Sequence, residues 1–228
     1  MKKHLTVLIV FCLTCFLVNS QNKNEVKIVF QPIFGNQLLF LDSTYTFEKD
    51  EIEFSTLKFY ISNFKLLNKD KNVFIEQNSF HLFDAEDIKK QSFTLAIPKG
   101  LLYTNLVFNL GIDSVTNTSG ALGGDLDPTN GMYWTWQSGY VNFKIEGTSS
   151  ACMNKRKEFQ YHLGGYMFPF LSLQKISLDI KSKSTIIISV DLRKIIETFN
   201  VSNIDHIMSP SAESVRFSNL ISKCFSIK

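Results

Sequence analysis

The sequence lacks the short motifs of the common enzyme classes. It contains no HExxH, no GxSxG and no P-loop, and none of its glycine-rich stretches is followed by a helix-initiating pattern. No nucleophile, base and orienting group stand out together. The sequence therefore favours a binding or structural role over an enzymatic one.

Long apolar runs are also missing, except for one at the N-terminus. Residues 1–20, MKKHLTVLIVFCLTCFLVNS, have a basic start, a short apolar stretch and small residues before Gln21, which is the pattern of a secretory signal peptide. The run is short for a bilayer, which takes about 20 apolar residues. We therefore predict one domain over residues 21–228, exported to the periplasm, the cell surface or the medium. Lipoprotein processing at Cys15 is less favoured, because Thr14 precedes it.

Charge of one sign is not in excess. Without Lys2 and Lys3, which leave with the signal peptide, the 24 basic side chains become 22 against 21 acidic ones. A nearly neutral domain offers no basic field to a polyanion. We expect neither a nucleic-acid partner nor a transmembrane segment in the mature chain.

Cysteine is scarce as well. Cys12 and Cys15 lie in the predicted signal peptide, so the mature domain keeps only Cys152 and Cys224. An exported chain meets an oxidising compartment, which favours a disulfide between them. A thiolate metal site is the weaker alternative, since neither cysteine belongs to a CxxC pair. We predict a disulfide.

The sequence does have a strong period of two. In EFQYHLGG, Phe159, Tyr161 and Leu163 fall on one face of a strand, and Gln160 and His162 fall on the other. Similar short runs, each ended by turn residues, recur along the chain, and 21 phenylalanines suit the inner faces of sheets. This pattern predicts a mainly β fold, an antiparallel, Greek-key-like β-sandwich.

One or two short helices are expected near the C-terminus. Asp191 is placed to cap LRKIIETF, and Ser209 to cap a second helix with Pro210 at its first position. An apolar stripe over residues 217–224 follows at helical spacing. Residues 51–70 fit either a strand or a helix, and we predict a strand.

Only His81, His162 and His206 follow the signal peptide. His162 is on the polar face of its strand, and the two glycines that follow Leu163 leave room for a close approach. His206 has Met208 two residues later. Imidazole and thioether groups suit copper, and methionine favours Cu(I). A lone strand histidine is more often simply hydrogen-bonded, yet the candidate metal ligands are His162, His206 and Met208.

Both tryptophans lie in GMYWTWQ. If this stretch is a strand, Trp134 and Trp136 share one face. Core packing is the default for such aromatic side chains. An exposed stacking platform for a glycan, completed by Tyr140, is the alternative, and a position beside a metal is the third possibility.

At these residues the chain resembles the MbnP-like family of secreted copper-binding proteins, named for methanobactin-associated members. The resemblance is carried by FNLGIDSVTNTSGALGGDLDPTNGMYWTWQSGYVNFKIEG and FQYHLGGY, and runs from about residue 25 to the C-terminus. It implies a β-rich exported domain. Some members bind copper through histidines and a tryptophan that a dihaem peroxidase-like partner oxidises to kynurenine.

The resemblance assigns His162 to the family's strand motif and Trp134 and Trp136 to its tryptophan block. One departure is that LGIDSVTNTSG lacks the histidine that copper-binding members often carry there. Two hypotheses follow. The first is a non-enzymatic copper-binding protein for metal acquisition or storage, with Cu(I) favoured. The second is a structural or glycan-binding β-sandwich that needs no metal.

Overall fold

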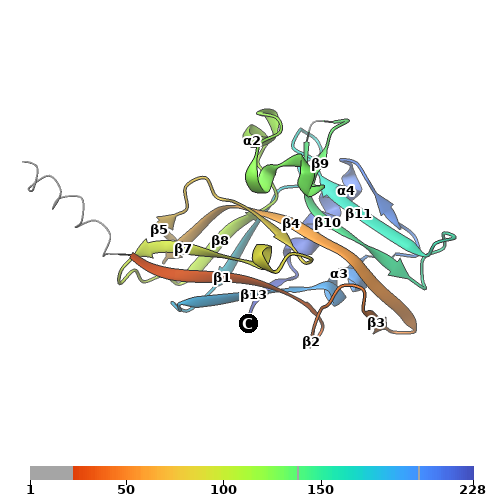
Figure 1. The fold of residues 1–228 in the computed structure, drawn as a ribbon, viewed down its shortest axis with the longest axis horizontal. Coiled ribbons are helices and arrows are strands. Elements are labelled where there is room, and N and C mark those ends of the chain that lie inside the picture. The colour runs from red at the N-terminus through yellow and green to blue at the C-terminus, as the bar shows by residue number, and fades with distance from the viewer. Residues whose placement is uncertain (1–22, 138, 200) are drawn as a thin grey trace, which may run out of the picture.

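The computed structural model describes residues 23–137, 139–199 and 201–228. The predicted signal peptide, with Cys12 and Cys15, lies outside the described residues. Two β-sheets face each other and enclose the main core (Figure 1). The predicted mainly β sandwich is thereby confirmed.

The smaller sheet is built around β1. Its strands follow the order β15-β13-β1-β2, and β7 also pairs with β1. Most pairings are antiparallel as expected, but β1 and β13 run parallel, with Ile28 opposite Ile186. The bounds are β1 Lys23–Phe34, β2 Gln37–Leu38, β7 Ser92–Pro98, β13 Thr185–Asp191 and β15 Phe225–Ile227.

The larger sheet follows the order β12-β8-β4-β10-β11-β14, and β3, β5, β6 and β9 pair with β4 or β10. Its longest strand, β4, covers the ambiguous segment, so the predicted strand is confirmed. The β4–β8 register shifts between Ser62 and Lys65, where Asn63 has a φ of 54°. The bounds are β3 Thr44–Phe47, β4 Asp50–Asn68, β5 Lys71–Ile75, β6 Phe80–Asp84, β8 Asn105–Leu110, β9 Tyr133–Trp134, β10 Gly139–Ser149, β11 Glu158–Gly164, β12 Gln174–Asp179 and β14 His206–Ile207.

Short helices join the strands. The bounds are α2 Ser114–Thr118, α3 Leu192–Thr198 and α4 Ala212–Ser222, and the 3₁₀ turns are η2 Ile88–Gln91, η3 Gly124–Leu126 and η4 Pro128–Asn130. Asp191 caps α3 as predicted, accepting a hydrogen bond from Arg193 N at 3.1 Å. The predicted cap of α4 is wrong: Ser211, not Ser209, accepts the bond from Ser214 N. Within the described ranges, no helix is long and apolar enough to cross a bilayer.

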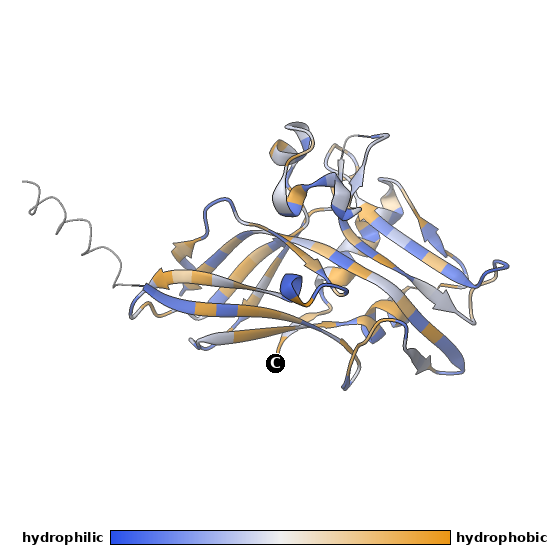
Figure 2. Ribbon diagram, viewed as in Figure 1, coloured by the Kyte–Doolittle hydropathy of each residue, from blue (hydrophilic) through white to orange (hydrophobic). Residues whose placement is uncertain are grey.

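The main core lies between the two sheets and is rich in phenylalanine. Phe59, for example, stacks on Phe83 and Phe143 with ring centroids 4.4 and 5.6 Å apart. Apolar and polar residues alternate along the strands that enclose this core (Figure 2). Such alternation lets one face of each sheet be buried while the other carries polar side chains.

A second, smaller apolar cluster lies on the opposite, outer face of the large sheet. Residues 111–137, which include α2 and β9, rise above that sheet in Figure 1 and bury the cluster beneath them. Its members are Tyr60, Leu82, Ile112, Leu126, Met132, Trp134, Tyr140 and Val141. The outer face therefore has an apolar region beside its polar one, and the candidate site lies at their boundary.

Candidate metal site on the outer face of the large sheet

His162 lies on β11 with the side-chain phase that the sequence predicts. Phe159, Tyr161 and Leu163 are fully buried in the main core, and the His162 side chain is on the outer face, 11% exposed. Lys144 on β10 is its direct cross-strand neighbour. The alternation along β11 thus excludes this imidazole from the core and presents it to the face that residues 111–137 partly cover.

A carboxylate holds one nitrogen of His162. Nε2 lies 2.6 Å from Oε1 of Glu146 on β10, and Thr56 donates a hydrogen bond to the other oxygen of Glu146 at 3.0 Å. The pKa of Glu146 is lowered to about 2, mainly by the hydrogen bond to His162. The positive charge of Lys144, at 3.5 Å, lowers it further. Glu146 therefore stays ionised and fixes the orientation of the imidazole. Nδ1 has no hydrogen bond to any described residue.

His206 lies on the strand next to His162. β14 runs parallel to β11, with Gln160 opposite His206 and Tyr161 opposite Ile207. His206 and His162 are therefore diagonal neighbours on one face, about 8 Å apart between Cα atoms from the usual strand spacing and rise. β14 ends at Ile207, and Met208 follows it directly in the chain.

The segment that carries His206 is held firmly to β11. Tyr161 donates its hydroxyl to the Ile204 carbonyl at 2.5 Å, and Gln160 N donates to the Asp205 carbonyl at 2.8 Å. The Asp205 carboxylate lies 2.7 Å from Nδ1 of His206. This contact leaves Nε2 as the accessible nitrogen of a side chain that is 46% exposed, and Met208 is also exposed, at 42%.

The two tryptophans differ in environment. Trp134 ends β9 and is buried, whereas Trp136 lies in the turn that follows and is 65% exposed. The prediction that both share one strand face is therefore wrong, because the strand stops at Trp134. Their rings still meet, with centroids 5.9 Å apart at 45°.

Trp134 covers the outer face of β11 close to His162. A Cβ added at Gly164 would lie 2.6 Å from the Trp134 ring, so the indole occupies the space that a side chain would fill. Gly164 is two residues beyond His162 on the same face, about 7 Å along the strand. The close approach that the sequence suggested after Leu163 is thus made by an indole, whose buried Nε1 has no hydrogen-bond partner among the described residues.

Comparison with known proteins agrees with this architecture. The model of the MbnP family matches residues 23–211. The chain belongs to the MbnP family. The structure is similar to that of MbnP from Methylosinus trichosporium, with a TM-score of 0.61 over 83% of each chain and 14% sequence identity, a likeness that shows the fold. No curated protein matches the chain.

The donor types on this part of the sheet, imidazole and thioether, are ones that would suit a soft monovalent ion. Among the described residues, no group of three or more histidine, cysteine, aspartate or glutamate side chains lies together as a metal site. A site built on His162 and His206 would therefore need a further donor, such as the thioether of Met208. Two imidazoles with a thioether suit Cu(I) better than a hard divalent cation.

The three aromatic rings do not form the exposed glycan-stacking platform that the sequence left open as an alternative. Trp134 and Tyr140 are both buried, and only Trp136 of the three rings is exposed. The hydroxyl of Tyr140 accepts a hydrogen bond from Leu122 N at 3.0 Å and donates one to the Leu126 carbonyl at 3.1 Å. Tyr140 therefore anchors the covering loop to the sheet instead of facing a ligand.

The predicted disulfide is also wrong. Cys152 and Cys224 are both buried, and both are free thiols. Cys152 directs its sulfur to the Val201 carbonyl and Cys224 directs its own to the Leu220 carbonyl, so each thiol has a local partner. Burial is the main cause that raises the pKa of both thiols to about 11.

Sequence reasoning missed Glu146 and the two asparagines that position the cover. Asn117 accepts a hydrogen bond from Tyr140 N at 2.8 Å, and Asn142 accepts one from Ile112 N at 2.9 Å. Both asparagines are about 2% exposed. The sequence shows that Glu146 lies on the polar face of β10. It does not show the pairing of β10 with β11 that brings Glu146 to His162.

Proposed function

We propose that this chain is an exported, non-enzymatic copper-binding protein that takes up Cu(I) for acquisition or storage. His162, His206 and Met208 would hold the ion on the outer face of β11 and β14, beside Trp134 and Trp136. The observation that carries the proposal is the β11–β14 register, which brings residues more than forty positions apart in the sequence to neighbouring places.

The hydrogen bonds around the two imidazoles support this role. Histidines that bind metals commonly donate their second ring N–H to a carboxylate, which fixes the tautomer and makes the other nitrogen more basic. Glu146 is placed to do this for His162 and Asp205 for His206. Each ring then directs one nitrogen to a carboxylate and keeps the other for an ion.

We further infer, from the family resemblance, that one tryptophan of the pair is oxidised by a dihaem peroxidase-like partner. Trp136 is the exposed member and touches Trp134, so the pair connects the surface to the neighbourhood of His162. In this conversion the indole takes up dioxygen and water and releases its C2 carbon as formate, so that the chain loses one carbon and gains one oxygen. Intact mass measurement of protein from its native host tests this directly.

Competition for Cu(I) with a chromophoric chelator tests the metal proposal. The wild-type chain should bind one equivalent, and His162→Ala or His206→Ala should lower the affinity by at least tenfold, because each removes a nitrogen donor. Met208→Leu should have a smaller effect. His81→Ala is the matched control, since His81 lies on β6 in a separate pair with Glu76. Unchanged binding by His162→Ala would remove the central residue of the proposal.

A further inference from the structure

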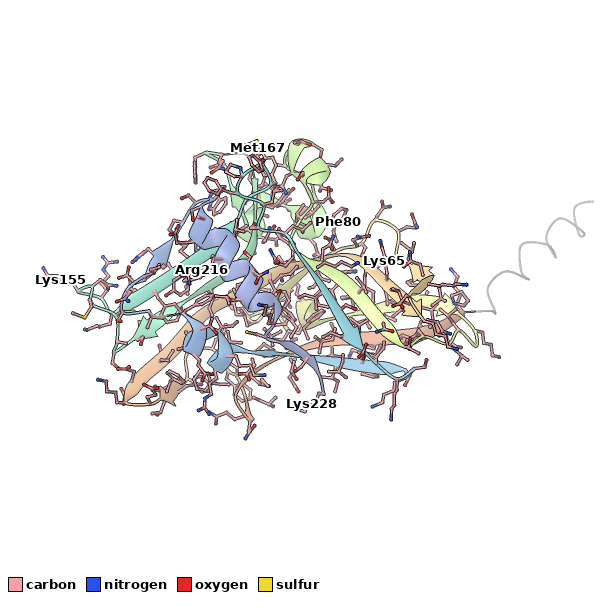
Figure 3. All side chains as sticks on the ribbon, turned by 180° about the vertical axis from the view of Figure 1, so that it is seen from behind. Lys65, Phe80, Lys155, Met167, Arg216 and Lys228 are labelled. Atoms are coloured by element: carbon pink, nitrogen blue, oxygen red, sulfur yellow. The ribbon has the colours of Figure 1, made fainter. Side chains whose placement is uncertain are left out.

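A cavity lies at an open edge of the sandwich, and none of the proposed metal ligands lines it. It has a volume of about 420 Å³ and lies where β12 ends and β13 begins, next to β15. Lys228, at its border, and Met167, near the covering loop, are at opposite sides of the molecule in Figure 3. Its lining is mainly apolar and includes Ile180, Ile186, Ile187 and Ile227.

The cavity lies at an edge where β12 and β15 end and β13 begins. β12 ends at Asp179, and β15 pairs only with Ile188–Val190 of β13. Lys228 N adds one bond to the Ile187 carbonyl, and no described strand covers the β15-side edge of β13 before that point. Ile186 and Ile180 belong to the main core, at 3% and 9% exposed, and form one wall of the cavity, whereas Ile187 is partly exposed.

The rim of this cavity is positive. Lys181 and Lys183, on the turn between β12 and β13, are exposed, and neither forms an ion pair with any described residue. Lys228 Nζ is held by Gln31 at 2.8 Å. The carboxylate that lines the cavity, that of Asp179, accepts a hydrogen bond from the Asn105 side chain. The rim therefore carries the ammonium groups of Lys181, Lys183 and Lys228 together with the carboxylate of Asp179, so cationic side chains are in excess at the mouth of an apolar space.

We propose that this cavity binds an amphipathic carboxylate, a single-chain fatty acid, with its acyl chain among the isoleucines and its carboxylate at Lys181 and Lys183. The volume falls within the range of about 300–1,000 Å³ that small-molecule sites occupy. The combination of apolar lining and cationic rim selects a ligand with an apolar body and one anionic end. This binding is independent of copper.

A peptide strand fits this edge less well. The part of β13 that is left uncovered on the β15 side is residues 185–186, whereas an average strand has about 5–6 residues. An added strand would gain few main-chain hydrogen bonds there. The geometry thus favours a small ligand over strand addition.

Titration calorimetry of the full mature chain with sodium decanoate tests the proposal. Affinity should rise roughly threefold to fourfold per methylene from hexanoate to decanoate, as burial of each CH₂ requires. Decanol, which lacks the charge, should bind more weakly. The double variant Lys181→Glu with Lys183→Glu should weaken decanoate binding by about tenfold or more, since it removes both charged donors. Lys175→Glu, an exposed lysine on β12 outside the cavity lining, is the matched control.

Several results would overturn the proposal. One is the absence of saturable decanoate binding by the wild-type chain, and another is equal binding by the double variant, whose fold circular dichroism checks. Sedimentation with phosphatidylglycerol vesicles provides a third: loss of vesicle binding in the double variant, without any decanoate binding by the wild type, would assign the lysines to a membrane surface. Decanoate binding that falls in His162→Ala would contradict a separate site.

Discussion

Two histidines of the large sheet each face a glutamate, yet their surroundings differ. Nε2 of His81 on β6 lies 3.0 and 2.9 Å from the two carboxylate oxygens of Glu76, and Nε2 of His162 on β11 lies 2.6 Å from Glu146. The His81 ring stacks on Phe93 with centroids 3.6 Å apart and planes 2° apart. His162 instead has β14 beside it and Trp134 further along its own face.

The comparison shows that a histidine–carboxylate pair alone does not make a metal site. Around His81, one face of the ring is covered by an aromatic side chain, and the described residues bring no second histidine or methionine to it as a strand neighbour. Around His162, the neighbouring strand carries His206 and leads to Met208. The difference comes from the strand pairings, and the following experiments test whether it has functional consequences.

The largest expected difference between the two histidine pairs is in Cu(I) affinity after the glutamate of each pair is replaced. Glu146→Gln should lower Cu(I) affinity by about 10–100-fold, as loss of a carboxylate behind a metal-bound histidine usually does. Glu76→Gln should leave copper affinity unchanged. Competition titration of both variants measures the contrast. Equal losses of Cu(I) affinity in the two variants would mean that His162 contributes no more to copper binding than His81 does. The proposed site would then be wrong.

The next largest effect is expected when the contact between Trp134 and Gly164 of β11 is disturbed. Gly164→Ala places a methyl group 2.6 Å from the indole and 2.7 Å from the Tyr140 carbonyl, so something must move. We expect a loss of about 1–3 kcal/mol in the free energy of unfolding, the usual effect of overpacking. Urea denaturation followed by tryptophan fluorescence measures it.

Gly123→Ala is the matched control for that substitution. No atom lies within 4 Å of its added Cβ. A stability loss in Gly123→Ala that equals the loss in Gly164→Ala would show that the effect is not one of packing. A stable Gly164→Ala protein with unchanged fluorescence would show that the indole does not rest on β11.

Much of the fold follows from short-range patterns in the sequence. The alternation in EFQYHLGG correctly separates His162 from the buried face of β11, because a period of two survives in any strand that covers a core. The Asp191 cap was predictable for a similar reason, since the cap and its helix are adjacent in sequence. Ser211 was missed because two serines flank Pro210, and local pattern alone does not choose between them.

The arrangement of the site was less predictable. β14 has only two residues, too few for any period to show, so its pairing with β11 left no signal in the sequence. The turn that exposes Trp136 likewise interrupts what reads as a strand. For Cys152 and Cys224, compartment chemistry favoured a bond, but the packing of two distant segments gave each thiol its own partner.

Acid should reveal the His162–Glu146 pair through stability. The pKa of Glu146 falls from its ordinary value near 4.5 to about 2, mainly through the hydrogen bond from His162. The stabilisation is therefore complete above pH 4.5 and is lost as the pH falls toward 2. For this partly exposed pair we expect a loss of about 1 kcal/mol, reduced in Glu146→Gln. Urea denaturation at pH 6 and pH 2.5 measures this loss. The same decrease in the free energy of unfolding between the two pH values in the wild type and in Glu146→Gln would contradict the pairing.

The smallest expected effect concerns the two free thiols. Because they form no disulfide, a reducing agent should leave the stability of the protein unchanged. Removal of a native disulfide usually costs about 2–5 kcal/mol, so an oxidised Cys152–Cys224 pair would lower the melting temperature on reduction. Because both thiols are free and buried, with pKa raised to about 11, we expect no change. A thiol reagent at pH 8 should react slowly with the folded chain and fully once it is unfolded. A drop in melting temperature on reduction would instead show that the two thiols form a disulfide, and their packing around Val201 and Leu220 would then have to change.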